Sequence, residues 1–237
     1  MNPEHVLYGS APSQFFEVWH PEQAVAGFAV FIHGGFWRAK YALSHANAFC
    51  AALAARSIIT ANVEYRRVGQ PGGAWPGSFE DVVAGIKAAS EHLGRAPVVV
   101  GHSAGGHLAL RLASEPVALK AVIALAPVAD LRLAYDLNLS NGAVAEFLGA
   151  TPDALPTRYD QACASSHASS TLRFIVHGTK DEDVAIEISR TFMQARHNDP
   201  QPPSLFEIPE AGHMDLIDPD SPAGLTVIDL VTRLAKE

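Results

Sequence analysis

Residues 97–110, PVVVGHSAGGHLAL, constrain the fold more than any other stretch of the chain. The three valines are typical of a strand buried on both faces, and HLAL begins an apolar helical pattern. Between them, Gly101 and Gly105 flank Ser103, and glycines are needed where a strained turn leaves no room for side chains. Gly106 lets the helix approach the sheet. The segment therefore predicts a strand, a sharp turn and a helix, with one hydroxyl at the helix N-terminus.

Apolar runs alternate with helical patterns along most of the chain, which is typical of a mainly parallel sheet with helices on both faces. A length of 237 residues suits a single α/β domain, which we place at 1–237. We therefore expect a doubly wound sheet flanked by helices. The pattern predicts strands at 15–19, 28–32, 58–63, 97–101, 121–126, 172–177 and 204–208, and helices at 41–56, 78–93, 104–115, 184–197 and 222–236.

The stretch 131–171 interrupts this alternation and separates two predicted strands. A connection of this length usually has structure or a function of its own. Within it, EFLGATPDAL predicts a short helix ending at Gly149 and a turn or second helix beginning at Thr151 and Pro152. We expect a small helical cap inserted over one edge of the sheet. An ordinary crossover helix with long loops is the alternative.

Charge and hydropathy exclude several classes of partner. The net charge of −8 argues against nucleic acid, because binding a phosphate backbone needs a concentrated basic surface. Nowhere do about 18 uncharged apolar residues run together, so we expect no membrane span. The first 20 residues lack a basic region followed by an apolar stretch, which favours a cytoplasmic protein. A homodimer is compatible with the sequence.

The two cysteines and the histidines give no sign of a metal site or a redox function. Cys50 and Cys163 lie far apart without metal-ligand spacing, which favours two buried free thiols over a disulfide. No H-E-x-x-H or similar histidine cluster is present. We therefore expect neither a metal nor a cofactor.

A serine hydroxyl is a poor nucleophile unless a neighbouring base removes its proton, so a histidine must be found. His213, in IPEAGHMDLIDP, follows the last predicted strand, and its intrinsic pKa near 6.5 suits proton exchange around pH 7. His177 ends a predicted strand, where packing is the simpler role. If no base were present, Ser103 would only cap its helix.

The base needs an acidic partner on its other ring nitrogen to fix its tautomer. Asp181, in FIVHGTKDEDV, follows a predicted strand and is the first choice. Asp183 is the alternative, although it is better placed to cap a helix beginning near Val184. Serine, acid and histidine then each follow a different strand at the carboxyl end, where open parallel sheets bind ligands.

Acyl transfer also needs hydrogen-bond donors for the oxygen that becomes negative. In FAVFIHGGFWR, a strand is followed by His33, Gly34 and Gly35, whose backbone can turn its amides toward a site. We assign the amides of Gly35 and Phe36, together with that of Ala104, to this oxyanion hole.

The segments HGGFW, GHSAGG, HGTKDEDV and GHMD, in this order, resemble the α/β-hydrolase superfamily over essentially the whole chain. HGGFW in place of HGGG, followed by NVEYRRVG and WPGSFEDV, is similar to the branch of kynurenine formamidases (arylformamidases) and small esterases related to hormone-sensitive lipase. The resemblance implies a metal-independent serine hydrolase with a covalent acyl-enzyme. This sequence departs from the lipase branch because it has no long N-terminal cap before the first predicted glycine-rich loop. We therefore expect 131–171 to supply most of the roof of the site.

We expect hydrolysis of a small carboxylic ester or aryl formamide, with Ser103, His213 and Asp181 as the catalytic residues. A peptidase or thioesterase activity on the same residues, or a non-catalytic ligand receptor, is the alternative. The substrate pocket is predicted to include Trp37, Trp75, His102 and Arg66. The alternatives are a core position for each tryptophan, a packed position for His102, and an ion pair between Arg66 and Glu80 or Asp81.

Overall fold

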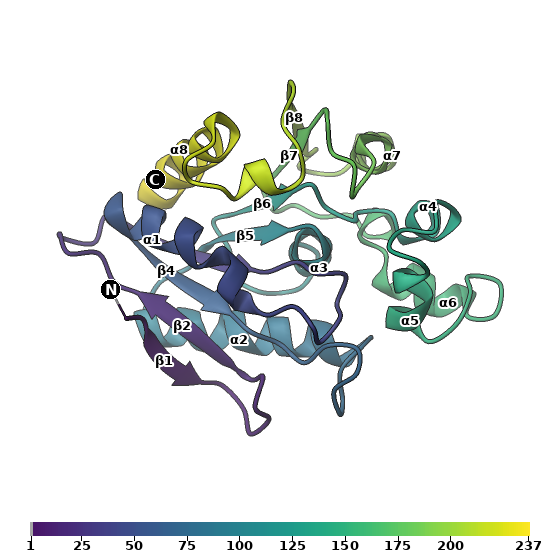
Figure 1. The fold of residues 1–237 in the computed structure, drawn as a ribbon, viewed down its shortest axis with the longest axis horizontal. Helices are drawn as coiled ribbons and strands as arrows, with labels where there is room; N and C mark the ends of the chain where they lie inside the picture. Colours follow the sequence, from purple (N-terminus) through teal and green to yellow (C-terminus); the bar gives the residue numbers. More distant parts are fainter. Residues whose placement is uncertain (1) are drawn as a thin grey trace.

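The computed structural model describes residues 2–237, which form one eight-stranded sheet in the order β1-β2-β4-β3-β5-β6-β7-β8 (Figure 1). The pairs β1–β2 and β2–β4 are antiparallel and the other five are parallel. This confirms the predicted α/β class with a mostly parallel sheet. The strands are β1 Glu4–Leu7, β2 Phe15–Trp19, β3 Gly27–Ile32, β4 Ile58–Val63, β5 Val98–His102, β6 Ala121–Leu125, β7 Arg173–Gly178 and β8 Ser204–Ile208.

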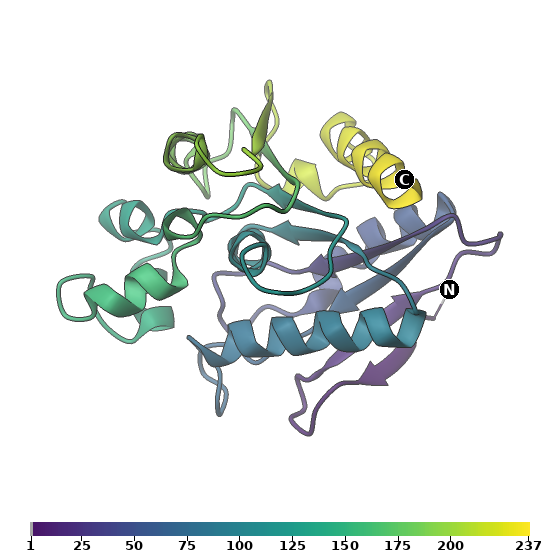
Figure 2. The same ribbon diagram turned by 180° about the vertical axis from the view of Figure 1, so that it is seen from behind.

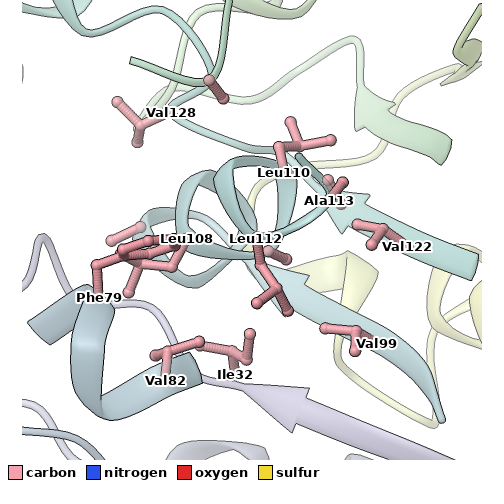
Figure 3. Packing of buried hydrophobic residues seen from close by; sticks show 14 of the residues in the cluster. Ile32, Phe79, Val82, Val99, Leu108, Leu110, Leu112, Ala113, Val122 and Val128 are labelled. Atoms are coloured by element: carbon pink, nitrogen blue, oxygen red, sulfur yellow. The ribbon is translucent and has the colours of Figure 1, made fainter. Parts of the chain in front are cut away.

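Helices cover both faces of the sheet (Figures 1 and 2). On one face, α1 (Asn47–Ala55) and α8 (Pro222–Lys236) share a buried apolar cluster with the sheet. On the other face, α2 (Gly77–Leu93), α3 (Ala104–Leu112) and α7 (Ile186–Arg196) share a second cluster. Figure 3 shows part of the second cluster, in which strand residues such as Ile32 and Val99 lie close to Leu108 and Leu112 of α3.

The central strands explain why their sequences are apolar without interruption. Every residue of β3, GFAVFI, is buried. Its alternate side chains enter different clusters, because Phe28, Val30 and Ile32 face α2 and α3 whereas Ala29 and Phe31 face α1 and α8. A strand covered by helices on both faces therefore has no polar side, as the sequence predicted.

The predicted elements agree closely with the observed ones. β2, β4, β8 and α8 begin and end at the predicted residues. The predicted helix 41–56 is divided into a short 3-10 helix, η1 (Leu43–Ala46), and α1. β1 was not predicted, because EHVL at the sheet edge is mostly exposed and lacks an apolar pattern.

The segment 131–171 forms a group of short helices to one side of the sheet (Figure 1). Gly149 ends α5 with a φ of 91°, as predicted, and residues 152–154 form a turn, which is the first of the two predicted alternatives, before the next helix begins at Pro156. Val144 and Phe147 pack into the same cluster as α2 and α3. The helices are α4 Leu131–Asp136, α5 Ala143–Leu148, α6 Pro156–Ala162 and the 3-10 helix η2 Ala164–Ser166.

Both cysteines are buried and free, as predicted. Among residues 2–237, no helix combines the length and the apolar character needed to cross a membrane.

Candidate active site

Ser103 occupies the single residue between the end of β5 and the start of α3, in a strained backbone conformation with φ 58° and ψ −118°. A hydrogen bond from its amide to the carbonyl of Leu125, at 2.8 Å, holds this turn. A side chain at Gly105 would overlap the carbonyl of Ile32, and one at Gly101 would overlap the carbonyl of Gly105. The flanking glycines are therefore required by the close approach of the turn to the sheet.

His213 and Asp181 lie on the loops that follow β8 and β7. The ring Nδ1 of His213 donates a hydrogen bond of 2.7 Å to Oδ2 of Asp181. The other carboxylate oxygen, Oδ1, accepts the amides of Asp183 at 2.9 Å and Val184 at 2.8 Å. These bonds fix the carboxylate and leave Nε2 of His213 as the ring atom able to accept a proton.

Asp181 is held in its charged form. Burial raises the pKa of its carboxyl, but hydrogen bonds from His177 and His213 and the positive charge of a protonated His213 outweigh burial and bring the pKa well below its usual range. His177 itself is fully buried, with Nδ1 2.7 Å from the Ser189 hydroxyl and Nε2 2.9 Å from the carbonyl oxygen of Val184. It is therefore packed in the core as expected, and its Nε2, 3.3 Å from Oδ2 of Asp181, also helps to hold that carboxylate.

Ser103 and His213 line the same cavity, which has a volume of about 250 Å³. Within residues 2–237, the Ser103 hydroxyl and the His213 ring form no direct hydrogen bond. Catalytic hydrogen bonds are often long or poorly aligned in a site without substrate and tighten when it binds. The fold thus brings the predicted serine and histidine to one cavity, and the predicted acid is joined to the histidine behind it.

The loop after β3 has three consecutive residues with positive φ: Gly35 at 101°, Phe36 at 50° and Trp37 at 56°. Gly35 and Phe36 line the cavity beside Ser103. The amides of Gly35, Phe36 and Ala104 have no acceptor among residues 2–237. A side chain on Gly34 would lie 2.9 Å from Cβ of Ser103, so this loop packs directly on the serine. Free amides beside the hydroxyl are what the predicted oxyanion hole requires.

His102 is the only one of the four predicted pocket residues that lines the cavity. Trp37 is fully buried in the core, with its ring stacked on that of Phe147 at 4.4 Å between centroids. Trp75 stacks on Phe79 at 5.3 Å and also lies away from the cavity. The prediction of pocket contact was therefore wrong for both tryptophans, which support the loop and helix around the site.

Arg66 forms the ion pair that was the alternative to substrate contact. Its Nε donates to Oδ2 of Asp81 and its Nη2 to Oδ1, each at 2.7 Å. This two-bond pairing commits the guanidinium to Asp81. Arg66 does not reach the cavity, so its assignment to the pocket was wrong.

His102 contacts the loop that carries the base. Its Nε2 lies 3.1 Å from the carbonyl oxygen of His213, and the two rings lie 4.4 Å apart. Burial, the largest cause, holds the pKa of His102 well below its usual value, so the ring is neutral and Nε2 donates to that carbonyl.

Sequence reasoning missed three other residues of the cavity, Tyr41, His45 and Met214, and named Asp183 only as the alternative acid. The ring of Tyr41 occupies the space that a side chain on Gly35 would need. Asp183 does not cap a helix, because α7 begins at Ile186 and the carboxylate of Asp181 accepts the amides of this turn. No local sequence pattern pointed to Tyr41, since its contact with Gly35 depends on the path of the intervening loop.

No residue of 131–171 lines the cavity, so the expectation that this segment supplies the roof was wrong. The segment instead supports, from the side of the core, the loop after β3 that carries the amides of the predicted oxyanion hole (the oxyanion loop). Nε of Arg38 donates to Glu146 at 2.7 Å, and Nη1 donates to the hydroxyl of Ser140 at 2.9 Å. Together with the stacking of Phe147 on Trp37, these bonds tie α5 to the loop.

Asp181, Asp183 and His213 place three possible metal-ligand atoms within 4.8 Å of one another. Asp181 is already committed to the ring Nδ1 of His213 and to two backbone amides. These bonds suit an acid that orients an imidazole better than a metal ligand, which needs free lone pairs. A larger hollow of about 350 Å³, between β8 and α8, contains no nucleophile paired with a base.

Comparisons with known proteins agree with this fold. Residues 29–201 match a family model described as the alpha/beta hydrolase fold. A truncated carbohydrate esterase from gut microbiota is 19% identical, with a TM-score of 0.82 and full coverage of both chains. Esterase 2 of Thermogutta terrifontis, phosphoramylated by tabun, is 22% identical with a TM-score of 0.77, covering 98% of this chain and 93% of that one.

A putative thioesterase from Silicibacter sp. TM1040 is 22% identical, with a TM-score of 0.76, covering 96% of this chain and 84% of that one. A search of the curated proteins gave no match. The solved structures show a shared fold, and the family model spans well over half of the residues. The chain belongs to the α/β-hydrolase fold family.

Proposed function

We propose that this protein is a serine esterase that cleaves small carboxylic esters through a covalent acyl-enzyme. The observation that carries the proposal is one cavity lined by Ser103, by His213 already bonded to Asp181, and by a loop with free amides. The strained turn presents the hydroxyl at the N-terminus of α3, where the helix dipole favours developing negative charge. Each group needed for acyl transfer is then present once.

In the proposed reaction, Oγ of Ser103 attacks the ester carbonyl carbon while Nε2 of His213 takes its proton. Asp181 keeps the imidazole in the reactive tautomer and stabilises the imidazolium. The amides of Gly35, Phe36 and Ala104 donate to the oxyanion of the tetrahedral intermediate. His213 then returns the proton to the leaving alcohol oxygen, and a water activated by the same histidine releases the acid.

The solved esterases support ester chemistry by analogy of fold, since this fold hosts many acyl-transfer reactions. The resemblance to arylformamidases favours an aryl formamide as a finer substrate assignment, because its formyl group is the smallest acyl group. The putative thioesterase among the structural neighbours favours a thioester as a second candidate. Side-by-side kcat/KM values for p-nitrophenyl acetate, N-formylkynurenine and an acetyl thioester rank the three.

The proposal is tested by following p-nitrophenol release from p-nitrophenyl acetate on the millisecond scale. An acyl-enzyme that forms faster than it breaks down gives a burst of up to one equivalent, and peptide mass spectrometry after acid quenching then finds acetyl on Ser103. The Ser103→Ala variant gives neither. Undiminished steady-state turnover by that variant would refute the proposal.

A further inference from the structure

Asp183 is the feature of the cavity that the proposed mechanism leaves without a role. Its side chain is exposed and lines the cavity. Among residues 2–237, its carboxylate takes part in no hydrogen bond or ion pair, and only its backbone amide is bonded, to Asp181. An unpaired carboxylate facing a binding cavity leaves its charge available to a ligand.

The position of Asp183 relative to His213 identifies the part of the substrate it faces. A carboxylate oxygen of Asp183 lies within 4.8 Å of a ring nitrogen of His213. His213 must protonate the leaving oxygen, so the alcohol portion of an ester passes beside this ring. Because Asp183 and His213 line the same cavity, the carboxylate lies near the path of the alcohol portion.

The other polar groups of the cavity add little charge to oppose this carboxylate. Burial, the largest cause, lowers the pKa of His45 to about 4 and that of His102 well below its usual value, so both are neutral near pH 7. Lys40 is exposed and lies over the Tyr41 ring, 4.8 Å from its centroid, outside the residues that line the cavity. Phe36 is an aromatic residue of the cavity lining, and aromatic faces attract cations.

We propose that Asp183 determines substrate preference, and that this enzyme favours esters whose alcohol portion carries a positive charge close to the ester oxygen. The inference rests on the proposed esterase function and names a substrate class for it. Asp183 acts here by attraction through space and takes no part in bond making or breaking. Esters with an anionic alcohol portion are disfavoured by the same charge.

The matched pair of acetylcholine and 3,3-dimethylbutyl acetate tests this directly. Both carry the same acetyl group and nearly the same shape, but only the first has a positive charge. The measured quantity is the ratio of their kcat/KM values, in which any general change in the reactivity of Ser103 or His213 cancels.

In the wild type the ratio is expected to exceed one. Asp183→Asn is expected to lower it about two- to fivefold, because an exposed charge pair contributes little. Glu182→Gln is the matched control, since it removes the same charge from an exposed neighbour that does not line the cavity. Sodium chloride at 1 M, where the Debye length is about 3 Å, should lower the wild-type ratio and leave that of Asp183→Asn nearly unchanged.

The outcomes separate the two proposals. Hydrolysis of both esters with an unchanged ratio in Asp183→Asn would overturn the role of Asp183 and leave the esterase function standing. An equal fall of the ratio in Glu182→Gln would overturn it too, because the effect would come from overall charge. Wild-type protein that cleaves neither these esters nor p-nitrophenyl acetate would overturn both proposals.

Discussion

The two sides of the cavity are built in different ways. On the side of the serine, Ser103 is 2% exposed, and the glycines around it have no room for a side chain. On the side of the histidine, Asp183 is exposed and Met214 is 51% exposed. The comparison teaches that the proposed nucleophile and oxyanion amides are held by packing, whereas the proposed base is positioned by hydrogen bonds on surface loops.

This difference fits the chemistry of each part. An oxyanion hole lowers the barrier only if its dipoles are already oriented, so it benefits from a packed loop supported by α5. The proposed base has to accept a proton from the serine and return it to the leaving group, and its bond to Asp181 orients the ring for both steps. Within residues 2–237 Ser103 and His213 form no hydrogen bond, so the proposal requires their approach to tighten when substrate binds.

The largest effect is expected from removing the nucleophile on the packed side. Ser103→Ala should lower kcat for p-nitrophenyl acetate by a factor on the order of 10⁶, as nucleophile loss does in other serine hydrolases. Steady-state assays check the rate, and urea unfolding checks that the variant is folded. Activity within tenfold of the wild type would contradict the account.

Changing the acid on the loop side should have the next largest effect. Asp181→Asn is expected to lower kcat by about 10⁴, because the amide favours the wrong tautomer of His213. Glu182→Gln, on the same loop but outside the cavity, should keep nearly full activity. If the two variants lost similar activity, the bond between Asp181 and His213 would have no special role.

Adding a side chain on the packed side of the cavity is expected to lower kcat less than removing a catalytic group does. In Gly35→Ala the new methyl would overlap the Tyr41 ring, and the left-handed backbone at Gly35 would be strained. Displacement of the oxyanion amides should lower kcat by about 10² to 10³ with little change in KM. An equal rise in KM with unchanged kcat would show that the loop only binds substrate.

The smallest predicted effect concerns stability rather than rate. Burial, the largest cause, lowers the pKa of His107 to about 4, whereas an unfolded histidine titrates near 6.5. Between these values the unfolded chain binds a proton that the folded chain excludes, so stability falls as the pH falls. The contribution of His107 between pH 7 and 5 is roughly 2 kcal/mol.

His107→Gln keeps a donor for the carbonyl of Ala162, which the ring Nε2 contacts at 2.9 Å. Urea unfolding at both pH values should show a smaller loss of stability on acidification in this variant. An identical loss in both proteins would mean that His107 is protonated in the folded state.

Much of the fold could be predicted because its signals are local. The strand, turn and helix around Ser103 are encoded within 97–110, and the strands that flank it are apolar without interruption. The acid and histidine could be chosen from their positions after predicted strands, since parallel strands end at the same edge of the sheet. β1 lacked such a signal because its edge position leaves it mostly exposed.

The pocket could not be predicted in the same way. Phe36 and Trp37 are adjacent, aromatic and both have positive φ, yet Phe36 lines the cavity and Trp37 is fully buried. Which of them faces the substrate depends on the packing of Phe147, which is distant in sequence. The same reason explains why 131–171 supports the oxyanion loop without forming the roof.

The central claim is that His213 activates one hydroxyl, that of Ser103. It is tested most directly by the rate at which a fluorophosphonate probe labels the wild-type protein and the His213→Gln variant, with the labelled residue identified by peptide mass spectrometry. The account predicts rapid labelling of Ser103 in the wild type and labelling at least a hundredfold slower in the variant, because an unassisted serine is a poor nucleophile. Equal rates in the two proteins, or a label on another residue, would contradict it.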